Sequence, residues 1–76
     1  MKIEIYNVHF WATQRQGNGK ERRTLQTVHM PRFDAVTRKH ITEEQRIEKG
    51  TQALTAEGFY DIEYGSTVAD ELIVTH

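Results

Sequence analysis

The feature that most constrains the fold is a pair of alternating runs joined by a short glycine-rich stretch. Residues 2–14 and 21–30 alternate apolar and polar side chains over most of their length, with Gln-Gly-Asn-Gly-Lys between them. An Asn-Gly pair flanked by alternating runs is the strongest short-range signal for a β-hairpin. We therefore predict two antiparallel strands joined by a two-residue turn at Asn18 and Gly19, with a longer loop as the alternative that Gly17 leaves open.

The predicted turn also determines which side chains of the hairpin face the core. Counted outward from a two-residue turn, Ala12 pairs with Leu25, and Leu25 then shares a face with Phe10. We predict that this face is buried. The opposite face leaves three apolar side chains near the surface: Trp11, Val28 and Met30. An exposed apolar patch often marks an interface, and the alternative is that Trp11 only covers its neighbours.

A change of phase within the first strand predicts a β-bulge. Ile3 and Ile5 occupy odd positions, whereas Val8 and Phe10 occupy even ones, so a regular strand would place the two pairs on opposite faces. A bulge at Tyr6-Asn7 keeps both sets on one buried face.

Residues 31–41 are predicted to form an extended connector. Pro31 cannot continue a central strand, so the second strand is expected to end at residue 30. In this interpretation three apolar side chains of the connector dip into the core: Phe33, Val36 and Ile41. The alternative is a short first helix capped by Asp34.

A helix is predicted over residues 43–57. Thr42 and Gln45 fit a capping box at its start. Gly50 interrupts the helix and is expected to mark a close approach to the sheet. Gly58 fits the left-handed position after the last turn, with Phe59 as the hydrophobic contact of a Schellman ending.

The C-terminal part predicts one or two further strands. Residues 59–64 alternate cleanly, and Gly65-Ser66 suggests a turn or a bulge. Residues 72–75 favour a final strand, whereas residues 67–70 are also compatible with one helical turn. The expected fold is a single α+β domain over residues 1–76, in the order ββαβ or ββαββ. It has a mainly antiparallel sheet with the helix packed on one face.

Composition argues against several classes of protein. The 76-residue chain has no cysteine for a disulfide or a thiolate metal site. Its histidines are too far apart in sequence to predict a metal site: His9, His29, His40 and His76. Ser66, the only serine, lacks the context of a nucleophile. Without a signal peptide or a membrane span, the sequence predicts a soluble, cytoplasmic protein that is not an enzyme and needs no cofactor.

Charge is sorted along the chain. Residues 1–40 carry eight basic and three acidic side chains, whereas residues 41–76 carry two basic and eight acidic ones. The basic half predicts a DNA or RNA surface on the hairpin, in which cations hold phosphates and Trp11 stacks on a base. The candidate residues are Arg15, Lys20, Arg22, Arg23, Arg32, Arg38, Lys39 and Trp11, with Gln14, Gln16, Asn18 or Gln26 at base edges. Alternatively, the two halves fold together and neutralise each other.

A protein–protein interaction module is the second hypothesis. Its partner would meet the exposed Trp11 face, the acidic helix or an open sheet edge. The candidate residues are Trp11, Val28, Met30, Glu43, Glu44 and Glu48. Head-to-tail contact of the basic hairpin with the acidic helix would also give a homodimer.

Overall fold

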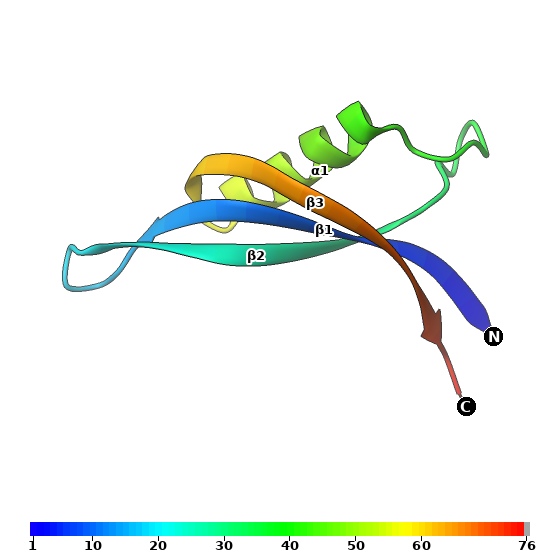
Figure 1. Ribbon diagram of the computed structural model, residues 1–76, viewed down its shortest axis with the longest axis horizontal. Helices are drawn as coiled ribbons and strands as arrows, with labels where there is room; N and C mark the ends of the chain where they lie inside the picture. Colours follow the sequence, from blue (N-terminus) through cyan, green and yellow to red (C-terminus); the bar gives the residue numbers. More distant parts are fainter. Residues whose placement is uncertain (76) are drawn as a thin grey trace.

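The computed structural model describes residues 1–75, which form a small α+β domain in the order ββαβ (Figure 1). The strands are β1 (Lys2–Arg15), β2 (Glu21–Pro31) and β3 (Tyr60–Ile73), and the helix is α1 (Glu43–Ala56). Both strand pairs are antiparallel, with β1 in the middle of the order β2-β1-β3. The predicted fold class is confirmed in its three-stranded form.

The loop between β1 and β2 is one residue longer than the predicted two-residue turn. Gln16 N–H donates to the Lys20 carbonyl at 2.7 Å, and Gly19 N–H donates to the Gln16 carbonyl at 2.9 Å. Gly19 has a φ of 81°, the left-handed conformation that ends a three-residue hairpin loop. The longer loop that Gly17 permits is therefore the one that forms.

The hairpin register consequently differs by one residue from the prediction. Trp11 pairs with Leu25 rather than with Gln26. Because side chains alternate between faces, this slip moves every β2 side chain to the opposite face. Val28 and Met30, predicted near the surface, pack against the core, whereas Leu25, predicted in the core, is 51% exposed. Burying two large apolar side chains instead of one gives this register the larger hydrophobic gain.

β1 has no bulge where the sequence predicts one. It pairs with β2 without interruption along the length of β2, through Tyr6 and Asn7. Ile3 and Ile5 therefore lie on the face opposite Val8, because side chains alternate along an unbroken strand. Ile5 is buried there, whereas Ile3 is 36% exposed.

β3 is one continuous strand, and the irregularities of the sheet lie in it. Its pairing with β1 shifts beside Gly65 and again beside Asp61, which has a φ of 48°. The turn or bulge predicted at Gly65-Ser66 is thus a bulge within the strand. Residues 67–73 continue β3 and form neither a helical turn nor a separate fourth strand.

α1 begins and ends at the predicted signals. Thr42 Oγ1 accepts from Gln45 N–H at 3.2 Å, and Gln45 Oε1 accepts from Thr42 N–H at 2.8 Å, which completes the capping box. Gly58 has a φ of 94°, and Phe59 N–H donates to the Leu54 carbonyl at 3.0 Å, as in a Schellman ending. The helix ends one residue earlier than predicted.

The core lies between α1 and one face of the sheet. Its buried side chains are Val8, Phe10, Ala12, Met30, Ile41, Leu54 and Phe59. A Cβ at Gly50 would overlap the ring of Phe10, which is fully buried. The predicted close approach of the helix at Gly50 is therefore confirmed.

The connector between β2 and α1 is a compact loop. The Asp34 carboxylate accepts backbone N–H bonds from Val36 and Thr37, so Asp34 organises a turn rather than a short helix. Of the three side chains predicted to dip into the core, only Ile41 does. Val36 is 91% exposed and Phe33 is 43% exposed.

The molecule is elongated, with extents of 43 × 30 × 19 Å. The hairpin loop and the connector lie at opposite ends, and the paired ends of β1 and β3 turn away from α1 (Figure 1). Over residues 1–75, no helix is long and apolar enough to cross a membrane.

α1 packs on one face of the sheet only. We call the other face the open face; β1 and β2 contribute Ile3, Ile5, Asn7, His9, Trp11, Thr13, Arg23, Leu25, Thr27 and His29 to it.

Candidate interaction surfaces

Two of the four cations at the hairpin end are paired with carboxylates. Arg15 lies 3.3 Å from Glu21, and Arg23 lies 3.2 Å from Glu63. Arg23 also donates to the Asp61 carbonyl at 2.6 Å. Exposed ion pairs stabilise a fold little, but they cancel charge locally. Because Glu63 belongs to the acidic half of the chain, the two halves partly neutralise each other here.

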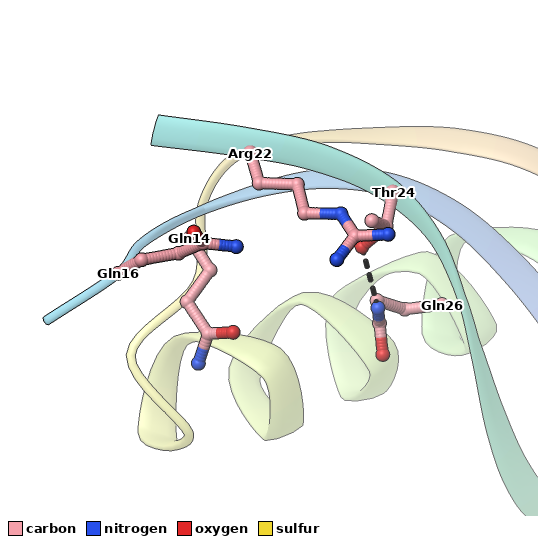
Figure 2. A pocket seen from close by; sticks show the side chains of 5 residues that line it. All are labelled: Gln14, Gln16, Arg22, Thr24 and Gln26. Carbon is pink, nitrogen blue, oxygen red and sulfur yellow. Dashed lines mark hydrogen bonds between the residues drawn. The ribbon is translucent and has the colours of Figure 1, made fainter. Parts of the chain in front are cut away.

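The other two cations at this end, Lys20 and Arg22, form no ion pair within residues 1–75. Arg22 lines a hollow of about 310 Å³ whose wall is otherwise polar and uncharged (Figure 2). The lining residues are Gln14, Gln16, Arg22, Thr24 and Gln26. The structure thus gathers three of the four side chains predicted at base edges around one cation.

Tyr60 reaches the Arg15–Glu21 pair from β3. Its hydroxyl is buried and has no hydrogen bond of good geometry within the described part of the chain. The nearby Tyr60 hydroxyl, followed by the Arg15 guanidinium, lowers the pKa of Glu21. Burial, followed by the Glu21 carboxylate, raises the pKa of Tyr60. Arg15, Glu21 and Tyr60 therefore lie together at this corner of the sheet.

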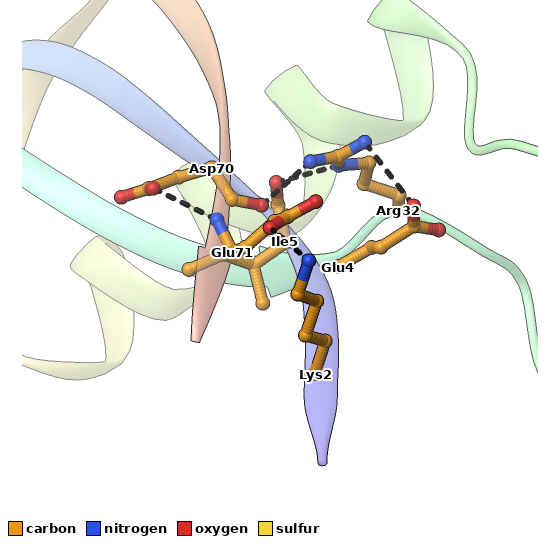
Figure 3. A network of polar contacts seen from close by, with 6 residues as sticks. All are labelled: Lys2, Glu4, Ile5, Arg32, Asp70 and Glu71. Carbon is orange, nitrogen blue, oxygen red and sulfur yellow. Dashed lines mark hydrogen bonds and ion pairs between the residues drawn. The ribbon is translucent and has the colours of Figure 1, made fainter. Parts of the chain in front are cut away.

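Arg32, one of the cations predicted to bind nucleic acid, joins the ends of the strands (Figure 3). Its Nε donates to the Ile5 carbonyl at 3.0 Å and its Nη2 to the Asp70 carbonyl at 2.6 Å. Nη1 lies 3.8 Å from Glu4, and the Arg32 side chain is only 18% exposed. These bonds commit the guanidinium to the fold.

The last two predicted cations lie far from the hairpin loop. Arg38 and Lys39 belong to the connector, at the opposite end of the molecule (Figure 1). Arg38 adopts a φ of 58° within the turn that Asp34 organises. The seven predicted cations therefore do not form one continuous basic surface.

The acidic helix residues and Trp11 lie on opposite sides of the sheet. Glu43, Glu44 and Glu48 are exposed on α1, which packs against the face that carries Phe10. Trp11 belongs to the open face. A partner of ordinary size would meet one of these surfaces, so the two sets of residues are separate candidates.

The open face carries two apolar groups, one toward each end. We call Trp11 and Leu25 the tip cluster; they pair directly across β1 and β2 and are 45% and 51% exposed. We call Ile3, Val68 and Leu72 the arm cluster; Ile3 pairs with Leu72, and Val68 with Asn7. Leu25 was not predicted on this face because the predicted register was one residue off. The arm cluster was not predicted for two reasons. The bulge expected at Tyr6-Asn7 put Ile3 on the buried face, and the bulge at Gly65 sets which β3 side chains share the open face.

The middle of the open face is polar, and its groups bond to one another. His9 Nδ1 lies 2.8 Å from Thr27 Oγ1. His29 Nδ1 lies 2.6 Å from Asn7 Oδ1, and Asn7 Nδ2 donates to Asp70 at 3.0 Å. The Glu71 backbone N–H, followed by the Asn7 amide, lowers the pKa of Asp70. These side chains are thus already supplied with partners inside one copy of the chain.

Ser66 lies beside His9 in the β1–β3 register. The His9 ring nitrogen that forms a side-chain contact bonds to Thr27 instead. Within residues 1–75 there is no group of three or more histidine, aspartate or glutamate side chains placed to hold a metal ion. His76 lies outside the described residues.

Searches against protein-family models, curated proteins and solved structures each gave no match.

Proposed function

We propose that this chain is a non-enzymatic binding module that contacts a protein partner through the open face of its sheet. The observation that carries the proposal is the half-exposed tip cluster, Trp11 and Leu25, on the side that α1 leaves uncovered. Removing apolar surface from water lowers the free energy by about 25 cal/mol per Å². Tryptophan is also among the residues that contribute most to protein interfaces.

The charges around the tip cluster favour a protein partner over a nucleic acid. Trp11 lies next to Glu63 in the β1–β3 register, and Glu63 already pairs with Arg23. Arg15 at the end of the same face is paired with Glu21. A face on which each of these cations has a carboxylate partner attracts a polyanion weakly, because phosphate binding depends on uncompensated positive charge.

A photo-reactive side chain on the open face tests this function. Leu25→p-benzoylphenylalanine places the probe beside Trp11, and Gln52→p-benzoylphenylalanine places a matched probe on exposed α1. We expect irradiation of cells that produce these variants to give a protein adduct at position 25 and none at position 52. The absence of a protein adduct at position 25, equal adducts at both positions, or an adduct only with nucleic acid would each contradict the proposal.

A second candidate function is nucleic-acid contact at the hairpin end, favoured by the hollow around Arg22. Three glutamine amides, which can donate and accept hydrogen bonds, line this hollow. Lys20 and Arg22 form no ion pair with the residues that the structure describes, so both can meet phosphates. Fluorescence anisotropy with single- and double-stranded probes at about 50 mM salt tests this function. Lys20→Ala with Arg22→Ala should abolish binding, whereas Lys2→Ala, at the far end of the sheet, should not. No binding by the unaltered chain would remove this candidate.

A further inference from the structure

The chain has a larger accessible surface than the average folded monomeric protein of the same mass. It has 8.9 kDa and 5631 Å² of accessible surface, about 800 Å² more than the roughly 4,800 Å² expected for that mass. Its radius of gyration is 14.2 Å, against about 11 Å for a compact domain of this length. A standard interface buries roughly 800 Å² on each partner. The excess is therefore about as large as the area that one partner contributes to a standard interface.

The apolar side chains of the open face are arranged for a two-fold contact. Trp11 of the tip cluster and Ile3 of the arm cluster are eight residues apart on β1, or about 27 Å along the strand. Between them lie the buried Ile5 and two polar residues, His9 and Asn7, whose side chains already have hydrogen-bond partners. In a two-fold interface each patch meets its complement on the other copy. A two-fold axis through the polar middle would place each tip cluster against the arm cluster of the second copy.

We infer that the occupant of the open face is a second copy of this chain, packed face to face and antiparallel, so that Trp11 and Leu25 of each copy meet Ile3, Val68 and Leu72 of the other. This inference rests on the proposed function and names its partner. It differs from a head-to-tail dimer of hairpin and helix, because α1 stays on the outside of both copies.

Two further features of the open face suit this arrangement. The paired ends of β1 and β3, which carry Ile3 and Leu72, turn away from α1 and hence toward the side of the occupant (Figure 1). The neutral side chains of the polar middle, His9, Thr27, Asn7 and His29, keep their hydrogen-bond partners when this part of the face is covered, and burial is expensive mainly for polar groups that lose their partners. The net charge of −1 gives little repulsion between two copies.

The mass of the chain in solution is the first part of the test. Sedimentation velocity from about 1 to 200 µM should show a concentration-dependent shift from 8.9 kDa to twice that mass. Leu25→Glu and Leu72→Glu should each weaken the dimer at least about tenfold, since each places a charge in an apolar contact. The matched control is Val36→Glu, at a connector residue that is 91% exposed, and it should leave the dimer unchanged.

A mixing experiment tests the antiparallel arrangement itself. Leu25→Glu and Leu72→Lys should each be monomeric alone, with circular dichroism spectra like those of the unaltered chain. Mixed together they should form a heterodimer, because one tip–arm contact becomes a Glu–Lys pair and the other keeps both leucines.

The outcomes separate this inference from the function on which it rests. A monomer at every concentration, a dimer insensitive to both leucine variants, or no recovery on mixing would overturn the antiparallel second copy. If the chain is monomeric and the position-25 probe still captures a different protein, the proposed function stands and the second copy does not. If the chain is monomeric and the probe captures no protein, both fail.

Discussion

Trp11 and Leu25 lie directly opposite each other across β1 and β2, and both are about half exposed on the face that α1 does not cover. This pairing exists because the hairpin loop has three residues rather than two, which moves Leu25 out of the core and Met30 into it. The same register thus builds the core and creates the apolar surface. A substitution can consequently be chosen to perturb one without the other.

Gly50→Ala should destabilise the fold although alanine is the better helix former. The added Cβ would overlap the buried Phe10 ring, and overpacking of this kind costs about 2 kcal/mol of unfolding free energy. Gly17→Ala is the control, because nothing lies within 4 Å of its added Cβ. Urea denaturation should show a clear loss for position 50 and a change within about 0.5 kcal/mol for position 17. Equal effects would contradict the close packing of α1 on the sheet.

Arg32→Ala should destabilise the arm formed by the paired ends of β1 and β3. The variant removes two charge-assisted bonds to the carbonyls of Ile5 and Asp70, for an expected loss of about 1–2 kcal/mol. Lys2→Ala, which removes an exposed ion pair at 3.8 Å to Glu71, should change stability by less than about 0.5 kcal/mol. Thermal or urea unfolding compares the two. If Arg32→Ala left the free energy of unfolding unchanged, the bonds of the guanidinium would not stabilise the fold.

Asp34→Asn should reduce the pH dependence of stability. The backbone N–H of Thr37, followed by that of Val36, lowers the pKa of Asp34 in the folded chain. Its ionised form therefore adds stability above the ordinary aspartate pKa near 3.8, and this contribution is lost as the pH falls through the folded value. Asparagine keeps an acceptor oxygen but does not titrate, so unfolding free energies measured from pH 7 to pH 3 should fall less steeply. An unchanged slope would contradict this role.

Tyr60→Phe should raise the pKa of Glu21 toward its usual value. The nearby Tyr60 hydroxyl is the largest single cause of the lowered pKa, and Arg15 lowers it both by a hydrogen bond and by its charge. NMR titration of the Glu21 carboxyl should therefore show an upward shift of the pKa in Tyr60→Phe, as in Arg15→Ala. An unchanged Glu21 pKa in Tyr60→Phe would show that the phenol does not act on this carboxyl.

The local signals in the sequence were sufficient for the helix and the order of elements. The signals at Thr42 and Gly58 depend only on hydrogen bonds to residues a few positions away. The ends of α1 were therefore predictable to within one residue. The hairpin register was not, because residues 16–20 accommodate two loop lengths that differ by one residue. Only the competition between Leu25 and the pair Val28 and Met30 for the core decides between those lengths.

The candidate site was less predictable than the fold. Arg23 and Glu63 are 40 residues apart, and their contact depends on β3 lying beside β1. The arm cluster depends on the bulge at Gly65, which selects the β3 side chains that share a face with Ile3. Trp11 was predicted near the surface and is half exposed there. Side chains alternate along β1, so Trp11 faces away from the buried Phe10 whatever the length of the hairpin loop.

The emission of Trp11, the only tryptophan, tests most directly whether a partner covers the open face. On dilution from about 100 µM to well below 1 µM, the unaltered chain should change from a blue, acrylamide-protected emission to a red, accessible one, as the second copy leaves. The Leu72→Glu variant should stay red throughout. A blue and protected Trp11 in the dilute monomer, or a red and accessible Trp11 at every concentration, would contradict a face-to-face dimer through this surface.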